Sequence, residues 1–307
     1  MSRNLGFPLL ILLTIGLGTL LYYNTCSSCA TSSNSASDIQ GISSGTPGSN
    51  SPDFSRTLTL VFPDGQVMRS GSNFIFGFSS PHFDLPIQEA LNPSIVRLRT
   101  FLDKNEDYRL SIKGLSRRDE SNPTAFASLG IARANQVKEY LKTKDFNTPQ
   151  IALDGQQVND SLDISYGKIN GPVEWKIERI PAETESMLNE SIQEPLVINF
   201  DTEGRGIQLS STQKNQFTAL FAYLDWNEEA LLEVTGHSAD TGSDEDSFRM
   251  GMKRADVVRK FFRDNGVPDN RMKSGSAGHN QSVASNRTTE GRKQNNRVVV
   301  QITLEKP

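Results

Sequence analysis

Two stretches of the chain repeat one another at an offset of 121 residues. ARANQVKEYLKTKDFNTPQI begins at Ala132, and KRADVVRKFFRDNGVPDNRM begins at Lys253. A repeat of this length predicts two copies of one domain rather than a solenoid of short units. The matched pairs at offset 121 are Arg133 with Arg254, Ala134 with Ala255, Val137 with Val258, Tyr140 with Phe261, and Leu141 with Phe262; at offset 122 Gly114 matches Gly236, and FGFSS at 76–80 matches INFDT at 198–202.

The two copies share one order of predicted elements. Ser210 and Gln213 form a capping box in front of the first helix of the second copy. The next helix carries apolar residues at helical spacing and stops near Gly266. The order β-α-β-α-β-β predicts an α+β sandwich, with helices on one face of a mixed sheet. Strands are expected near 74–78, 108–112, 151–153 and 173–177, then near 196–200, 231–235, 272–274 and 298–304; helices are expected near 87–102 and 125–141, then on the apolar sets Phe217, Leu220, Phe221, Leu224 and Phe248, Met252, Ala255, Val258, Phe262.

The N-terminal residues 1–26 predict a membrane anchor. Residues 5–23 carry no charged side chain, and a helix of that length just spans a hydrocarbon core of about 30 Å. Arg3 precedes the segment and no charge follows until Asp38, so the positive-inside rule places the N-terminus in the cytoplasm. A cleaved signal peptide ending at Ala30 is the alternative. A lipid on Cys26 is disfavoured, because residues 23–25 are not small and aliphatic.

Residues 27–56 indicate a flexible linker, because Ser, Gly, Asn, Thr and Pro dominate them and cannot bury a core. Cys26 and Cys29 form a C-x-x-C at its start. A redox pair needs a folded scaffold that lowers a thiol pKa, so a small disulfide or two idle thiols is the favoured interpretation. The predicted organisation is an anchor at 1–26, a linker at 27–56, the first copy at 57–181 and the second at 190–307.

Composition argues against several function classes. The 307 residues carry a net charge of −4, and Lys and Arg form no stripe of the kind that binds nucleic acid. Neither of the two cysteines lies near any of the three histidines, which leaves little for a metal site. No nucleophile and base stand at recognisable spacing. We therefore expect no metal, no cofactor and no catalysis.

Three ordered motifs resemble a known family. LEVTGHSADTG begins at Leu232, MKRADVVRKFF follows in a helix, and EGRKQNNRVVVQI stands near the C-terminus. Together they resemble the OmpA/MotB C-terminal peptidoglycan-binding domain. The resemblance covers residues 196–303 well and residues 74–177 weakly, as a degenerate copy. It implies non-catalytic binding of the peptide stem of the cell wall.

The resemblance also implies a binding site. In this family an Asp in the turn after the strand holds the ammonium of a diamino acid, usually diaminopimelate, and an Arg in the following helix holds the adjacent carboxylate. A zwitterion needs one anion and one bidentate cation side by side. The implied peptidoglycan-binding residues of this chain are Asp240, Thr241, Gly242, Arg254, Asn295 and Arg297.

The chain departs from the family pattern at two places. The position of the family's Asp holds Ala239, and the carboxylate comes one residue later at Asp240. Asp240 then either reaches the ligand or only caps the turn. The family often has Asn-Arg-Arg near its C-terminus, whereas this chain has Asn-Asn-Arg at 295–297, so one basic contact is missing.

The first copy departs further. Its turn reads GLSRRDES, with Arg117 and Arg118 where the family has an acid, and with Asp119 late. Arg133 is retained at the position that matches Arg254. We therefore expect the first copy to fold but not to bind diaminopimelate.

These features predict a single-pass membrane protein with its N-terminus in the cytoplasm and its folded domains in the periplasm, holding the membrane to peptidoglycan. Association with the outer membrane is the alternative location. One alternative function is a periplasmic protein–protein scaffold that has lost wall binding. The other is a component of a membrane motor or secretion assembly; for a proton-driven motor, residues 5–23 lack an ionisable side chain.

Overall fold

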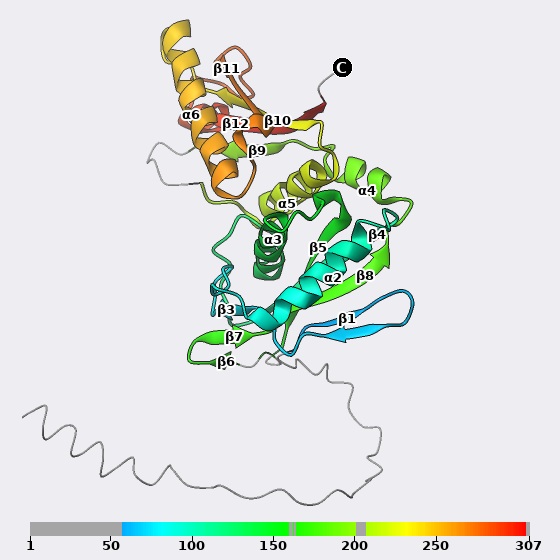
Figure 1. The fold of residues 1–307 in the computed structure, drawn as a ribbon. Coiled ribbons are helices and arrows are strands. Elements are labelled where there is room, and N and C mark those ends of the chain that lie inside the picture. The colour runs from blue at the N-terminus through cyan, green and yellow to red at the C-terminus, as the bar shows by residue number, and fades with distance from the viewer. Residues whose placement is uncertain (1–56, 160–161, 163, 201–206, 305–307) are drawn as a thin grey trace, which may run out of the picture. The chain divides into compact units, whose positions relative to one another are not determined.

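A computed structural model describes residues 57–159, 162, 164–200 and 207–304 of the chain (Figure 1). Residues Pro52–Pro307 form one compact unit, within which we distinguish an N-lobe (57–179) and a C-lobe (196–304). The predicted anchor, the linker and the two cysteines lie outside the described residues. Among the helices that the structure describes, none is both long and apolar enough to cross a bilayer.

The C-lobe is a four-stranded mixed sheet with the order β11-β10-β12-β9, in which the pair β10–β11 is parallel. This confirms the predicted order of strands and helices. A seven-residue helix, α7, was not predicted. The elements are β9 (Leu196–Asn199), α5 (Ser211–Trp226), β10 (Ala230–His237), α6 (Asp244–Asp264), η3 (Asp269–Arg271), β11 (Met272–Gly278), α7 (Thr289–Asn295) and β12 (Arg297–Leu304).

Local sequence signals explain both long helices of the C-lobe. The capping box is present: Ser210 Oγ accepts from Gln213 N, and Ser210 N donates to Gln213 Oε1. Residues from α5, α6 and the sheet bury one common core, so both helices cover the same face. Phe248 lies in α6 as predicted, but its side chain is 50% exposed. The buried positions in the first turns of α6 are the small residues Ser247 and Gly251.

The N-lobe repeats part of this arrangement. Its central strand, β4, has a parallel neighbour (β5) and an antiparallel neighbour (β8), as β10 has β11 and β12. The strand β3 pairs with β7 instead of joining this sheet, so the fourth strand of the predicted sandwich is missing. The elements are β1 (Thr59–Val61), β2 (Val67–Arg69), β3 (Ile75–Gly77), η1 (Glu89–Leu91), α2 (Asn92–Leu102), β4 (Tyr108–Arg117), α3 (Leu129–Lys142), η2 (Thr148–Gln150), β5 (Ile151–Val158), β6 (Ile164–Ser165), β7 (Lys168–Asn170) and β8 (Val173–Arg179); α4 (Thr184–Ser191) follows.

In both lobes a glycine pair brings a helix against the central strand. A Cβ on Gly236 would lie 1.9 Å from the carbonyl oxygen of Gly251, and a Cβ on Gly114 would lie 1.9 Å from that of Gly130. Backbone therefore packs directly on backbone at the same place in each lobe. This contact holds the start of α6 over the end of β10, where the turn that resembles a binding loop begins.

We expect Gly236→Ala to destabilise the protein by about 1–3 kcal/mol, because the added methyl group overpacks a backbone contact. The midpoint of urea-induced unfolding of the full chain measures the loss. Gly275→Ala in β11 is the matched control, since a Cβ there meets nothing within 4 Å. Equal shifts for the two variants would contradict the steric explanation.

The lobes share buried contacts. Phe126, which precedes α3, packs edge-to-face on Phe217 and Phe221 of α5, with ring centroids 5.4 and 5.2 Å apart. Lys138 of α3 is fully buried and forms an ion pair with Asp225 of α5. Its Nζ lies 4.4 Å from the centroid of the Phe221 ring. An apolar cluster and a buried charge pair therefore join α3 to α5.

Candidate functional site

The turn after β10 is held in place from two sides. Ser238 Oγ donates to the carbonyl oxygen of Ser247 in α6, at 3.0 Å. Ala239 N donates to Asn296 Oδ1 at 2.8 Å, and Asp240 N lies 3.3 Å from Asn286 Oδ1. The turn thus depends on the first turn of α6 and on the segment that leads into β12.

Asp240 caps this turn. Its Oδ1 accepts a hydrogen bond of 2.8 Å from Gly242 N, and Gly242 has a positive φ of 94° that suits glycine. The residue is exposed, and no cation of the described chain forms an ion pair with its carboxylate. The capping interpretation of Asp240 therefore has a contact in the structure.

Arg254 lies on α6 and reaches back to β10. Its Nη1 donates to the carbonyl oxygen of His237 at 3.2 Å. Burial lowers the pKa of this guanidinium. No carboxylate within the described ranges pairs with it, although Asp244, Glu245 and Asp246 begin the same helix. Arg254 is therefore a half-buried cation that has unused hydrogen-bond donors and no anionic partner among the described residues.

The structure separates the other predicted residues by role. Asn295 is fully buried, and its amide serves the preceding loop: Oδ1 accepts from Val283 N and Ala284 N, and Nδ2 donates to the oxygens of Ala284 and Asn286. All its bonding capacity is used, so it positions the loop. Thr241 Oγ1 lies 2.9 Å from Ser247 Oγ.

Asn296 is a positioning residue that the sequence interpretation missed. Asn296 stands where the family often has the first arginine of Asn-Arg-Arg, and its Oδ1 accepts a hydrogen bond from Ala239 N. Ala239 itself is only 6% exposed. The position of the family's acid therefore faces the protein interior, anchored through its own amide.

His237 and Arg297, at the ends of neighbouring strands β10 and β12, are both buried. Arg297 Nη2 donates to the carbonyl oxygen of Gln281 at 3.0 Å. Arg297 Nη1 and His237 Nδ1 are buried without a hydrogen-bond partner among the residues described. Burial, and then the charge of Arg297, lower the pKa of His237 to about 4. The backbone carbonyl of His237 accepts a hydrogen bond from Arg254.

This histidine predicts acid sensitivity. An unfolded histidine has a pKa of about 6.5. Between this pH and about pH 4, His237 is therefore protonated in the unfolded state but neutral in the native state. The stability that His237 contributes is fully present above pH 6.5 and is lost as the pH falls towards 4; with screening by solvent this loss is about 1–3 kcal/mol. The free energy of unfolding, measured in urea at pH 7 and at pH 4, should decrease by a smaller amount for His237→Gln than for the wild type. His82→Gln, at an exposed site, is the control, and its unfolding free energy should depend on pH as that of the wild type does.

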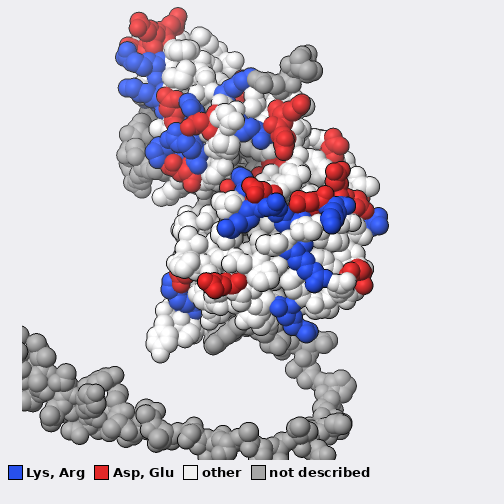
Figure 2. Space-filling model, in the orientation of Figure 1, with Lys and Arg blue, Asp and Glu red and all other residues white. Residues whose placement is uncertain are grey.

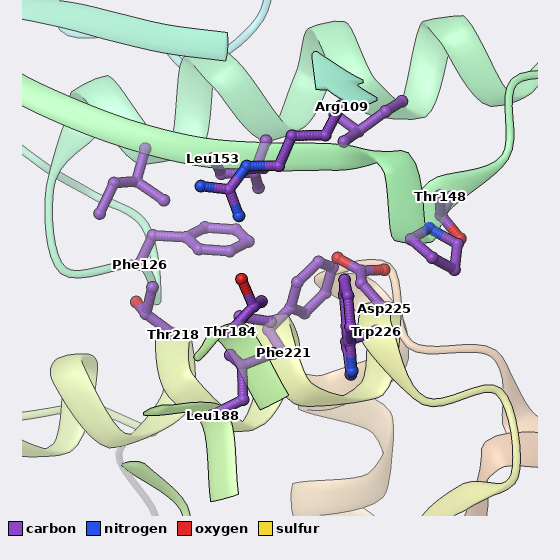
Figure 3. A pocket seen from close by; sticks show the side chains of 15 residues that line it. Arg109, Phe126, Thr148, Leu153, Thr184, Leu188, Thr218, Phe221, Asp225 and Trp226 are labelled. Atoms are coloured by element: carbon purple, nitrogen blue, oxygen red, sulfur yellow. The ribbon is translucent and has the colours of Figure 1, made fainter. Parts of the chain in front are cut away.

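A cavity of about 260 Å³ lies between β5 and α5 and is mostly apolar. Figure 3 shows the rings of Phe126, Phe221 and Trp226 beside the charged ends of Arg109 and Asp225. Both charges are already paired: Arg109 bonds Glu178 at 2.8 Å, and Asp225 bonds Lys138. Because no free charge is left there, this cavity is a poorer site for a zwitterion than the turn beside Arg254.

Charges of both signs alternate on the face shown in Figure 2. Among the described residues, Arg259 of α6 pairs with Asp269 at 3.0 Å, and Lys168 of β7 pairs with Asp84 at 2.6 Å. These pairs are exposed, and each contributes little to stability. The unpaired Arg254 therefore stands apart from the arginines that form ordinary surface ion pairs.

The C-lobe is similar to proteins of a known family. Residues 200–297 match the OmpA family. The sodium-type flagellar protein MotY of Vibrio parahaemolyticus is 27% identical over 101 residues, which are 33% of this chain and 34% of that protein. A peptidoglycan-associated lipoprotein of Agrobacterium fabrum is 33% identical over 87 residues, 28% of this chain and 48% of that protein. The chain thus spans less than half the length of each.

Among solved structures, the peptidoglycan-associated lipoprotein of Burkholderia pseudomallei is similar to part of the chain. The match has 23% sequence identity and a TM-score of 0.31, and it covers 35% of this chain and 89% of that one.

Proposed function

We propose, from the premise that residues 200–297 form an OmpA-like domain, that the protein is a non-catalytic anchor that holds a membrane of the cell envelope to peptidoglycan. The C-lobe is the binding module in this proposal, and the ligand is the diaminopimelate of the peptide stem. The name of one relative, a peptidoglycan-associated lipoprotein, supports the class of ligand.

The observation that carries the proposal is the unpaired guanidinium of Arg254. It is partly withdrawn from water and bonds only a backbone carbonyl of the described chain, so an incoming carboxylate would meet unused donors in a fixed orientation. Charge-assisted bidentate pairs of this kind are among the strong hydrogen bonds of proteins. Asp240 offers a carboxylate on the turn for the ammonium group of the same amino acid.

The remaining parts of the proposal concern location and duplication. Residues 1–26 would form the anchor and 27–56 the spacer, which puts the folded residues in the periplasm. Residues 57–181, which include the N-lobe, would be a degenerate copy of the domain at residues 190–307, which includes the C-lobe. The matched glycine pairs and the matched pairing of β4 and β10 support the duplication.

Sedimentation with purified peptidoglycan sacculi tests the proposal. The full chain should pellet with sacculi, and free diaminopimelate should compete it into the supernatant. Sacculi whose stems carry lysine in place of diaminopimelate are the control for side-chain recognition and should bind more weakly. A chain that stays in the supernatant under all salt conditions would leave wall anchoring without support.

A protein–protein scaffold is the second candidate, and Ala239 favours it, because the family's acidic position is filled by a buried methyl group. A motor or secretion component would be one setting for such a scaffold. In this case the chain should fail to bind sacculi yet remain folded, as circular dichroism and a cooperative unfolding transition would show.

A further inference from the structure

Arg133 of the N-lobe is fully buried and hydrogen-bonded on every side. Its Nε donates to the carbonyl oxygen of Ser80, its Nη1 to Leu115 O and Glu120 Oε2, and its Nη2 to Gly77 O and Glu120 Oε1. A guanidinium has five N–H groups, so none is left unused. Both Arg133 and Glu120 have side chains that are 0% exposed.

The Glu120 carboxylate is held as completely as the arginine. Besides the two bonds from Arg133, its Oε1 accepts from Ser79 N and its Oε2 from Arg117 N, both at 2.8 Å. Four donors thus converge on one carboxylate. The neighbouring acid behaves differently, since Asp119 is exposed and bonds the side chain of Arg117 at 2.9 Å.

The two lobes place their arginines alike against the central strand. Arg133 Nη1 donates to the carbonyl oxygen of Leu115 at 2.8 Å, and Arg254 Nη1 donates to that of His237 at 3.2 Å. Leu115 follows Gly114 in β4 as His237 follows Gly236 in β10. The main difference is the anion: Arg133 has Glu120, and Arg254 has no acidic partner in the described part of the chain.

We propose that the N-lobe has kept a carboxylate-binding site and fills it with its own Glu120. The site consists of the Arg133 guanidinium and the backbone N–H groups of Ser79 and Arg117. Its ligand class is a monocarboxylate, which the chain supplies from within, and removal of the Glu120 side chain opens it to small carboxylates from solution. The proposal concerns the N-lobe alone and does not depend on wall binding by the C-lobe.

The test is chemical rescue of Glu120→Ala in the full chain. Its melting temperature should fall by about 10 °C, because a buried charge has lost its partner. Sodium acetate at ten times its dissociation constant should return about 3–5 °C relative to sodium chloride of equal ionic strength. The wild type and Asp119→Ala should show no acetate-specific gain.

Glu120→Gln is the matched control for space, since its amide fills the volume that acetate needs. It should be destabilised and not rescued. If Glu120→Ala does not accumulate as folded protein, refolding yield in acetate against chloride replaces the melting temperature, with the same expected difference. Equal values in the two salts, or equal rescue of Glu120→Gln, would overturn the proposal.

Discussion

Arg254→Ala is expected to abolish measurable sedimentation of the protein with peptidoglycan sacculi. A hydrogen bond to a charged group contributes about 1.5–3 kcal/mol, which corresponds to roughly 10- to 150-fold in affinity. The guanidinium already lies against β10 through the His237 carbonyl, so little ordering is needed on binding. Arg259→Ala is the control on the same helix, because that arginine pairs with Asp269, and it should bind like the wild type.

The acidic half of the site should respond more weakly. Asp240 already accepts from Gly242 N, so Asp240→Asn should reduce binding less than Arg254→Ala does. Ala239→Asp should tighten binding if the site has room for the family's carboxylate. No gain from Ala239→Asp together with no loss from Arg254→Ala would favour the scaffold over the wall anchor.

Asp225→Ala is expected to destabilise the protein by about 3–5 kcal/mol, since it leaves the buried Lys138 ammonium with only the more distant Glu139 carboxylate, at 3.7 Å. Lys138 is fully buried between the lobes. Burial lowers its pKa, whereas burial raises the pKa of Asp225, so each charge depends on the other. The urea-induced unfolding midpoint of the full chain measures the loss.

The double variant Lys138→Met/Asp225→Leu is the control for this pair. Replacement of a buried ion pair by apolar residues of similar volume is often neutral or stabilising, and the site already borders Phe221. We expect the double variant to unfold near the wild-type midpoint. Equal losses for the single and the double variant would show that the pair contributes more than mutual neutralisation.

Much of the secondary structure could be predicted because its signals are local. The capping box at Ser210 needs only the residue three positions later, and the helix of the second motif ends at Asp264, before the glycine and proline that predict its end. In α6 the close approach to Gly236 requires a small residue at Gly251, whereas Phe248 lies in the helix but is half exposed. The close contact between α6 and β10, which the helical spacing of apolar residues does not reveal, decides which residues of this helix are buried.

Local patterns in the sequence were enough to predict the order of elements in the C-lobe and the OmpA-like motifs within it. The partners of the two matched arginines, in contrast, could be learned only from the folded chain. Arg133 and Arg254 stand at matched positions in the repeat, yet one is saturated by Glu120 and the other has no anion among the described residues. Likewise, Lys138 and Asp225 are 87 residues apart. Such partners are brought together by the paths of loops and by the docking of lobes, which leave no periodic signal in the chain.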